Sequence, residues 1–486
     1  MSDILKLQPE SVWKNFYALT QIPRPSKSEE KIRNFLHDYG KNLGLETIID
    51  EVGNVIIRKP ATKGMENRKG VVMQAHMDMV PQKNSDKIHD FTTDPLEPWI
   101  DGDWVRAKGT TLGSDNGIGL SAALSVLESK DLAHGPIEVL VTTDEETGMT
   151  GAFGLKPGFL KSDILLNLDS EDEGELYVGC AGGVNANMKL KYTETAIPAN
   201  TSAFKLHIKG LKGGHSGLDI NMGRGNSNKI MFRFLKKAQS EVGLCLATAE
   251  GGNLRNAIPR ESVATVLVPT DHVDKFKKMV AEYEALVKSE LAATEPTFSL
   301  SVESTVTPSK MMDSTSQSVL INSVYGCPNG VIRISDAMPG LIETSTNLAI
   351  VKAEKGEAEV ICLLRSSVNS AKEDLCQMID SVFALAGAEV EFSGDYPGWR
   401  PNINSEILNL MKSIYEKKYG KIPEVKAIHA GLECGLLGDV YPNWDMISFG
   451  PTIRHPHSPD EKVNVPSVQK FWDFLVETLK NVPVKN

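Results

Sequence analysis

The sequence predicts an open α/β sheet domain interrupted by an inserted α+β domain, and three observations favour this fold class. Short apolar runs rich in β-branched residues alternate with helical patterns in both terminal parts of the chain. Polar residues follow several of these runs directly, as they do where the strands of an open α/β sheet end at a ligand site. Near Gly182 the pattern changes to half-buried strands and longer helices.

The length of the chain also favours more than one domain. Its 486 residues exceed what one hydrophobic core usually serves. We therefore expect a discontinuous domain made of residues 1–186 and 398–486, with residues 187–397 inserted as a second domain.

The composition excludes several classes of protein. A net charge of −11 argues against a nucleic-acid partner, because phosphate binding needs a basic surface. The six cysteines are scattered without a CxxC pair, which is typical of reduced thiols in a cytoplasmic protein. No signal peptide is evident, and no apolar stretch approaches the ~18 residues of a membrane span. We therefore expect a cytoplasmic protein that has no membrane partner.

The first terminal part is predicted to hold a capped helix and a series of short strands. Ser26 and Ser28 can cap a helix that runs from Glu29 to Gly40. The strands are β-branched runs bounded by turns or polar connectors. We expect them at residues 53–58, 71–80, 136–143 and 163–169.

A Gly-rich loop at residues 109–119 precedes an Ala-rich helix at residues 120–127. Such a loop is similar to a phosphate cradle at a helix N-terminus. It lacks the Lys-Ser/Thr of a P-loop and the GxGxxG spacing of a dinucleotide site, so neither is predicted. The notable residue of this loop is Asp115, which stands where the helix begins.

The inserted part and the C-terminal part continue the series of elements. The insertion is expected to have strands at residues 204–208, 263–268, 346–351, 358–364 and 389–393. Its helices are expected at residues 228–241, 273–291 and 371–385. After turn residues at 394–400, the α/β pattern resumes with helices at 405–419 and 467–481 and a strand at 446–449.

His76 and Asp78 stand in the strand predicted at residues 71–80. Side chains two places apart on a strand point to the same side, so both can reach one site. A histidine that binds metal usually donates its second ring N–H to a carboxylate. The alternative is a buried, hydrogen-bonded histidine beside an aspartate in a turn. Taken alone, these two residues favour that alternative, because short motifs are often false positives.

Five strand-end or loop positions carry side chains that are typical metal ligands. Two histidines with three carboxylates can hold two zinc ions if one carboxylate bridges them. Cobalt or manganese could occupy the same set of ligands. The five residues are His76, Asp115, Glu146, Asp169 and His457.

The doublet Glu145-Glu146 indicates two different roles for neighbouring carboxylates. One carboxylate can bind metal while its neighbour serves as general base toward a metal-activated water. From the pattern alone, the two glutamates could exchange these roles.

Five motifs occur in an order that resembles the co-catalytic di-zinc metallopeptidases of the carboxypeptidase-G2/aminoacylase-1 type. They are His76-Met-Asp78, Gly113-Ser-Asp-Asn116, Asp144-Glu-Glu146, Asn167-Leu-Asp169 and His457-Ser-Pro-Asp-Glu461. Further segments resemble the aminoacyl-histidine dipeptidase (Xaa-His, carnosinase-like) subgroup of that family. They are Arg58-Lys-Pro-Ala-Thr62, Gly64-Met-Glu-Asn-Arg68, Leu211-Lys-Gly-Gly-His-Ser-Gly217, Leu254-Arg-Asn-Ala-Ile-Pro-Arg260 and His429-Ala-Gly-Leu-Glu-Cys-Gly435. The resemblance covers nearly the whole chain.

The resemblance implies a mixed-sheet exopeptidase domain with two Zn²⁺ ions, and it implies a role for each ligand. His76 and Asp169 would hold one ion, and Glu146 and His457 would hold the other. Asp115 would bridge the two ions, and the peptide bond after it would be cis.

The resemblance also decides two alternatives that the residues left open. Glu145 would be the general base, and later the acid toward the leaving amine, while Glu146 binds metal. His457 would be the last ligand in preference to His455, because only His457 begins the family's motif. Asp78 would orient the histidine two places before it.

In the family, the inserted domain is a lid that completes the site. His215 matches the lid histidine and would donate a hydrogen bond to the oxyanion of the transition state, which is worth ~3–4 kcal/mol. Arg365 and Asn256 resemble lid groups that bind the C-terminal carboxylate of a dipeptide, a group that an arginine fork suits. His429 and Glu433 either approach the substrate or belong to the structure of their loop, and the sequence leaves both interpretations open.

The predicted activity is the metal-dependent hydrolysis of unblocked dipeptides, with Xaa-His dipeptides and β-alanyl-histidine (carnosine) among them. A broad-specificity dipeptidase or an N-acyl amino acid amidohydrolase could use the same metal core, and a metal-binding protein without catalysis is a further alternative. The expected partner is a small dipeptide. The sequence leaves open whether the lid serves a single chain or packs in a homodimer.

Overall fold

The structure, a computed structural model, describes residues 3–485, and the chain divides into two compact units. Unit 1 contains the chain up to Gly179, together with Pro401–Ala427 and the part from Leu432 onward. Unit 2 contains Cys180–Arg400 and Ile428–Gly431. Unit 2 therefore starts before and ends after the insertion predicted at residues 187–397, and the short second segment was not expected in it.

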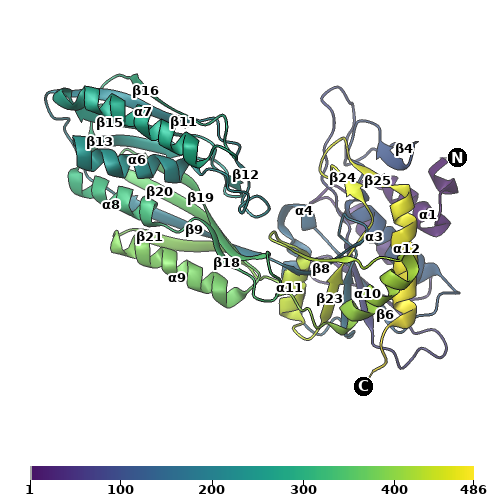
Figure 1. Cartoon of the computed structure of the whole chain (residues 1–486). Coiled ribbons are helices and arrows are strands. Elements are labelled where there is room, and N and C mark those ends of the chain that lie inside the picture. The colour runs from purple at the N-terminus through teal and green to yellow at the C-terminus, as the bar shows by residue number, and fades with distance from the viewer. Residues whose placement is uncertain (1–2, 486) are drawn as a thin grey trace. The chain divides into compact units, whose positions relative to one another are not determined.

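Unit 1 is organised around an eight-stranded mixed sheet (Figure 1). Its strands β3 (Val71–His76), β6 (Ile137–Thr142) and β7 (Ile164–Asn167) are buried along their whole length, as their mainly apolar sequences predict. β3 pairs in parallel with both β6 and β7, so the carboxyl ends of these three strands share one edge of the sheet. The strand predicted at residues 71–80 ends at His76, which leaves Asp78 in the following loop.

The remaining strands of unit 1 extend this sheet and form a smaller one. In order across the large sheet the strands are β1 (Glu46–Ile49), β2 (Val55–Lys59), β6, β3, β7, β23 (Asp445–Ser448), β8 (Glu175–Cys180) and β22 (Glu424–Ile428). The small sheet has the order β24 (Ile453–Arg454), β25 (Lys462–Asn464), β5 (Trp104–Ala107) and β4 (Pro98–Asp101).

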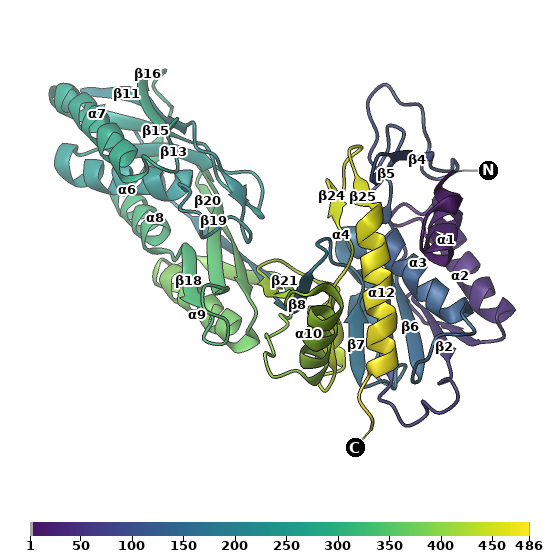
Figure 2. The same cartoon turned by 45° about the vertical axis from the view of Figure 1, so that its right-hand side comes forward.

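Helices pack against the large sheet of unit 1. Helix α3 contacts β3 and α1, α2 contacts β1 and β2, and α10 contacts β23. Figure 2 shows α10 and α12 next to each other, in agreement with their contacts. The helices are η1 (Asp3–Lys6), α1 (Glu10–Thr20), α2 (Glu30–Asn42), α3 (Ser114–Glu128), α4 (Glu145–Gly148), α5 (Thr150–Gly154), α10 (Glu406–Tyr419), α11 (Glu433–Val440) and α12 (Val465–Asn481).

Unit 2 is built on a nine-stranded antiparallel sheet. Strand β11 (Thr201–Lys209) shows the expected alternation, with Phe204, Leu206 and Ile208 buried and Lys205 exposed. Across the sheet the order is β16 (Ser299–Ser304), β11, β15 (Ser262–Pro269), β13 (Cys245–Gly251), β19 (Ile342–Glu354), β20 (Glu357–Ser366), β9 (Gly182–Lys191) and β21 (Glu389–Tyr396), with β18 (Gly330–Ile334) on β19. Two-stranded pairs are formed by β10 (Glu194–Thr195) with β17 (Met311–Met312), and by β12 (Gly214–His215) with β14 (Ala257–Ile258).

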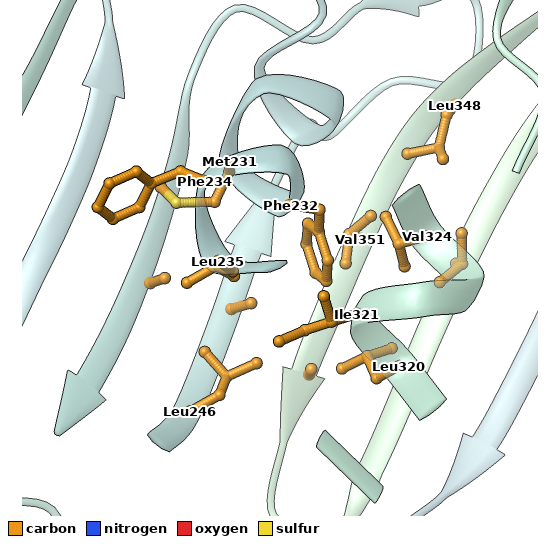
Figure 3. Packing of buried hydrophobic residues seen from close by; sticks show 14 of the residues in the cluster. Met231, Phe232, Phe234, Leu235, Leu246, Leu320, Ile321, Val324, Leu348 and Val351 are labelled. Atoms are coloured by element: carbon orange, nitrogen blue, oxygen red, sulfur yellow. The ribbon is translucent and has the colours of Figure 1, made fainter. Parts of the chain in front are cut away.

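The core of unit 2 lies between this sheet and its helices. Figure 3 shows Phe232 of α6 and Ile321 of α8 meeting close to Val351 of β19, and all three belong to one buried cluster. The helices are α6 (Ser227–Val242), η2 (Thr270–His272), α7 (Val273–Glu290), α8 (Ser314–Gly326) and α9 (Asn369–Leu385). Within the described part of the chain, none of the helices has the length and apolar character of a membrane span.

Candidate active site

The five side chains predicted to bind metal come together in unit 1, close to where β3, β6 and β7 end. Asp115 presents one carboxylate oxygen to each histidine, with Oδ1 3.1 Å from His76 Nε2 and Oδ2 3.2 Å from His457 Nε2. His76 Nε2 also lies 3.4 Å from Asp169 Oδ1, and His457 Nε2 lies 2.9 Å from Glu146 Oε2. The five residues thus form two groups of potential ligands that share Asp115.

The spacing and burial of these atoms suit divalent cations. Two ligand atoms that each lie ~2.0–2.1 Å from a tetrahedral zinc ion are roughly 3.3 Å apart. The separations in the two groups run from 2.9 to 3.4 Å. In addition, Glu146 Oε1 is buried and accepts no hydrogen bond from the described residues, which is costly for a carboxylate unless a ligand meets it. The residues present therefore fit a pair of cations.

Asp78 connects the end of β3 to the start of α4. It is fully buried, and its Oδ1 lies 3.3 Å from His76 Nδ1. Its two carboxylate oxygens also accept hydrogen bonds from the backbone N–H groups of Glu145 (3.0 Å) and Glu146 (3.2 Å) and from Ser26 Oγ (2.8 Å). Although burial opposes ionisation, these partners, with His76 first, lower the pKa of Asp78 to about 2. One ionised side chain thus holds both the histidine and the glutamate doublet.

The site as a whole contains more buried acids than bases. Burial, with Asp169, Glu433 and Glu146 adding to it, raises the pKa of Glu145 well above its usual range, although His76 opposes the shift. Burial also raises the pKa of Asp169 to about 6. The acids are Asp78, Asp115, Glu145, Glu146, Asp169, Glu171, Glu433 and Glu461, and the basic groups are Arg24, His76 and His457. Cations would relieve the repulsion among these acids.

His457 and Glu146 belong to a group of potential ligands that contains Asp115, whereas His455 and Glu145 do not belong to that group. Hydrogen bonds with Asp115 and Glu146 raise the pKa of His457 to about 11, against the effect of burial. Among the described residues, His455 belongs to none of the groups that could hold a cation. Glu145 reaches the group of His76 and Glu146 but makes no close contact with His457.

The predicted oxyanion donor and the two predicted substrate-binding residues of the insertion lie together in unit 2. β12 and β14 pair His215 with Ala257, and the Ser216 N–H donates to the Asn256 carbonyl at 2.8 Å. Arg365 Nε in turn donates to Ser216 Oγ at 3.3 Å. Ser216, which the sequence did not single out, therefore links all three predicted residues.

The hydrogen bonds of His215 define its tautomer. Its Nδ1 accepts from the backbone N–H groups of Gly217 (3.2 Å) and Leu218 (3.0 Å). Burial, and then the nearby Arg365 cation, lower the pKa of His215, so the ring is neutral at pH 7. A neutral imidazole that accepts at Nδ1 carries its proton at Nε2, which makes Nε2 a hydrogen-bond donor.

Arg365 is a buried cation whose hydrogen-bond partners, among residues 3–485, are two hydroxyl groups. It is 6% exposed and donates to Ser216 Oγ and, at 3.2 Å, to Tyr396 Oη. No carboxylate among the described residues pairs with it. A buried guanidinium without a counter-ion is costly, so this position suits an anionic ligand.

Comparison with known proteins agrees with a metallopeptidase site. The sequence model of the peptidase family M20/M25/M40 matches residues 72–481 of the chain. The chain belongs to this peptidase family. The predicted family and the predicted α/β fold class are therefore confirmed, and the chain is an enzyme of the M20 metallopeptidase type.

Two relatives match the M20 chain over its full length. The cytosol non-specific dipeptidase of Escherichia coli is 48% identical over 485 residues, which covers 100% of both proteins. The crystal structure of aminoacylhistidine dipeptidase from Vibrio alginolyticus is 51% identical, with a TM-score of 0.97 over 100% of this chain and 99% of that one. Aminopeptidase PepT from Bacillus cereus, at 17% identity and a TM-score of 0.57 over 98% and 99% of the two chains, shares the fold.

Two buried residues of this M20 chain support the site but were not predicted to do so. Arg24, which is 1% exposed, donates to the carbonyl oxygens of Met77 (3.0 Å), Asp78 (2.7 Å) and Gly113 (2.5 Å). It thereby joins the end of β3 to the loop that carries the predicted bridging aspartate. Its sequence context, two flanking prolines, gives no sign of this role. Glu461 holds the same loop from another direction.

Glu433 and His429, whose roles the sequence left open, lie in different units. Glu433 in unit 1 is 1% exposed and accepts hydrogen bonds from Gln74 Nε2 (2.6 Å) and Thr142 Oγ1 (2.8 Å). Burial raises the pKa of Glu433 to about 7. His429 in unit 2 is buried, and its Nε2 lies 2.7 Å from Ser345 Oγ.

Asp169 is held by the residue that follows Asp115. The Asn116 side chain donates to Asp169 Oδ1 and, at 2.8 Å, to the Leu168 carbonyl. The Asp115–Asn116 peptide bond is cis, as the family resemblance implied.

Proposed function

We propose that this M20 peptidase is a di-zinc dipeptidase that hydrolyses unblocked dipeptides, with Xaa-His dipeptides and β-alanyl-histidine among its substrates. One observation carries the proposal: Asp115 offers a separate oxygen to each of two histidines, and each histidine has a further carboxylate partner. The printed names of the two full-length relatives, a cytosol non-specific dipeptidase and an aminoacylhistidine dipeptidase, support the substrate class.

The ligand assignment follows the two groups. His76 and Asp169 would hold one zinc ion, Glu146 and His457 the other, and Asp115 would be shared. Bound zinc would acidify a water molecule and polarise the scissile carbonyl. Cobalt or manganese suits the same ligands, so the ion used in the cell is a matter for measurement.

Glu145 is the proposed general base. It is the first residue of α4, its N–H is held by Asp78, and its side chain reaches the group formed with His76 and Glu146. A carboxylate there can accept a proton from the attacking water and return it to the amine nitrogen as the peptide bond breaks. Asp78 is the proposed positioning residue for His76.

The proposed substrate-binding residues come from unit 2. The Nε2–H of His215 would donate to the oxyanion that develops on the scissile carbonyl. Arg365, which has no carboxylate partner in the described part of the chain, would bind the C-terminal carboxylate of the dipeptide together with Asn256. Recognition of this end would favour dipeptides over substrates that lack the carboxylate.

The name of the Escherichia coli relative favours a second candidate, a dipeptidase of broad specificity. The same name supports the proposed cytoplasmic location, and the acidic charge supports the absence of a nucleic-acid partner. A homodimer and an N-acyl amino acid amidohydrolase activity stay predictions of the sequence.

A substrate panel tests the proposed function. The zinc-loaded protein is assayed on carnosine, an α-linked Xaa-His dipeptide, dipeptides without histidine, a tripeptide and an N-acetyl amino acid. We expect turnover of free dipeptides and little of the last two. Equal turnover of histidine-free dipeptides would favour the broad-specificity candidate, and activity confined to the acetylated substrate would overturn the dipeptidase proposal.

A further inference from the structure

The loop that leads into Asp115 is held by one buried carboxylate from the far end of the chain. Glu461 is 2% exposed. Its Oε2 accepts from the backbone N–H groups of Leu112 (2.7 Å) and Gly113 (2.9 Å). Its Oε1 accepts from Ser114 N (2.7 Å), Ser114 Oγ (2.6 Å) and Asp115 N (3.3 Å).

The local sequence explains why this loop presents so many donors to one point. Gly113 has a φ of 68°, a left-handed conformation that glycine adopts readily. Successive N–H groups in such a turn point to one side and form a concave anion site. Here the anion is a side chain of the chain itself, and the regular helical backbone of α3 follows only after Asn116.

Such an arrangement is rigid because breaking it would leave both the carboxylate and the N–H groups buried without hydrogen bonds. A carboxylate removed from water costs several kcal/mol unless hydrogen bonds replace its hydration. The N–H groups of Leu112, Gly113 and Ser114 are buried with Glu461, so they too would lose their partner.

The same carboxylate stands four residues after His457, in one compact turn. The Glu461 N–H donates to the Ser458 carbonyl at 3.0 Å, and the Asp460 N–H donates to Ser458 Oγ at 3.1 Å. The side chain of His457 is itself 51% exposed, and its backbone φ is 58°. This half-exposed histidine therefore depends on its own turn for its position, and Glu461 anchors that turn to the Asp115 loop.

We propose that Glu461 is a positioning residue that sets the spacing of Asp115 and His457 in the cation site formed with Glu146. Asp115 and His457 are connected in two ways. Their side chains lie 3.2 Å apart (Asp115 Oδ2 to His457 Nε2), and the Asp115 N–H donates to Glu461, which the turn at 457–461 joins to His457. In the described part of the chain, Glu461 belongs to none of the groups that could hold a cation, so its effect is exerted through its neighbours.

The other cation site shares Asp115 but has further supports of its own. His76 ends the buried strand β3 and contacts Asp78, while Asp169 accepts from Asn116. A change at Glu461 should therefore affect the two sites unequally, and the site that contains His457 should weaken most.

Glu461→Gln tests the proposal, because it keeps the size of the side chain but turns an amide NH₂ toward N–H donors. Glu138→Gln is the matched control. Glu138 is 4% exposed and accepts from Lys161 N (2.8 Å), Ser162 N (2.9 Å) and Ser162 Oγ (2.8 Å). It lies near the start of β6, at the strand end opposite the site.

Zinc binding to the metal-free proteins is measured by competition with a chromophoric chelator, and folding by urea denaturation. We expect E461Q to lose roughly 10–100-fold in affinity at one of two zinc sites, the usual effect of removing a residue that supports a ligand. In the Co²⁺-loaded protein the visible absorption should change in E461Q and stay unchanged in E138Q. Ser114→Ala, which removes one donor, should weaken the same site less.

Two results would overturn the proposal: E461Q binding both ions as tightly as the wild type, or E138Q losing zinc to the same degree. If E461Q does not fold, Ser114→Ala decides alone, and unchanged zinc affinity there counts against the proposal. The inference rests on the proposed two-cation site, but its outcome is separable from the proposed reaction. A wild type that binds two zinc ions without cleaving dipeptides would overturn the reaction and leave the role of Glu461 testable by affinity.

Discussion

In unit 1 the buried polar group around Asp115 consists mostly of acids, whereas the buried group around Arg365 in unit 2 contains a cation and neutral partners. Asp115, Asp169 and Glu146 lie 2.9 to 3.4 Å from the two histidines and exceed them in number. In unit 2, Arg365 is surrounded by the hydroxyls of Ser216 and Tyr396. Burial and Arg365 lower the pKa of both His215 and His429, so these rings add no charge at pH 7.

The difference in charge indicates which kind of ligand each buried group would bind. An acid cluster of this kind is stabilised by cations, while a buried arginine without a counter-ion is stabilised by an anion. Changes in unit 1 should therefore act on zinc and turnover, and changes in unit 2 on the recognition of the substrate's charge.

The largest effect is expected from Glu145→Gln. Removal of a general base should lower kcat roughly 10²–10⁴-fold, while zinc content stays at the wild-type level because Glu145 is not a proposed ligand. Steady-state kinetics and metal analysis measure the two quantities. Glu51→Gln, at an exposed ion pair with Lys156, is the control. Retained turnover, or loss of zinc, would show that the roles of Glu145 and Glu146 are wrongly divided.

Arg365→Met removes the buried cation beside Ser216 and Tyr396 and should act only on substrate recognition. We expect kcat/KM for dipeptides to fall about a hundredfold, or ~3 kcal/mol, because the substrate carboxylate loses its partner. Zinc affinity should not change. The decisive comparison uses a dipeptide amide, which lacks the carboxylate and should be cleaved equally by wild type and variant.

Arg233→Met is the control for this prediction, since Arg233 is a half-exposed arginine of the same unit that pairs with Glu290. A loss that is as large with the amide as with the free dipeptide would mean that Arg365 supports the fold of unit 2 rather than a carboxylate.

Removal of the metal ions should lower the local stability of unit 1 and leave that of unit 2 unchanged. A ligand that binds only the folded state stabilises it by ~2.7 kcal/mol when present at a hundred times its dissociation constant. After a chelator has removed the metal, amide hydrogen exchange should therefore be faster at residues 112–116 and at the end of β3. The rate should return to its slower value when zinc is added. Equal changes at β12 and β14 of unit 2 would contradict the assignment of the cations to unit 1.

Sequence patterns predicted those features of unit 1 that depend on residues close to one another in the sequence. The buried runs of β3, β6 and β7 indicated strands, and the rule that ligands gather at strand carboxyl ends indicated where His76 and Asp169 should lie. Pattern alone did not separate Glu145 from Glu146 or His457 from His455. Family resemblance supplied those choices.

Contacts between distant parts of the chain could not be predicted in this way. Glu461 meets Ser114 across 347 positions, and Arg24 meets Gly113 across 89. Nothing local marks a buried arginine or glutamate as a support for a loop, because hydropathy places both types on the surface.

Unit 2 shows a second reason for missed elements, which is polar residues inside regular structure. β19 runs over Ile342–Glu354 instead of residues 346–351, because Thr344 and Ser345 are polar yet buried. Helix α8 (Ser314–Gly326) was not predicted, since Ser- and Thr-rich sequences have weak helix propensity. Its cap, Asp313, accepts from the N–H groups of Thr315 and Ser316 and was a usable signal.

The smallest expected effect concerns the neutral histidine of unit 2. Burial, followed by Arg365 and His215, lowers the pKa of His429 from its usual 6.5 to about 3. Between these values the unfolded chain binds more protons at this residue than the folded chain does. The contribution of His429 to stability is therefore full above pH 6.5 and is lost as the pH falls, by up to about 1.4 kcal/mol per pH unit.

His429→Gln keeps a polar partner for Ser345 but does not titrate. The stability of unit 2 in this variant should decline less between pH 6 and pH 4 than in the wild type, as measured by urea-dependent hydrogen exchange at β19 (roughly 1.4 kcal/mol per pH unit is the upper limit of the difference). His37→Gln, at a partly exposed histidine of unit 1, is the control. If both variants keep the wild-type slope, His429 is protonated in the folded protein, and unit 2 would hold a second cation beside Arg365. The contrast between the acid-rich group around Asp115 and the group around Arg365, with its single cation, would then have to be redrawn.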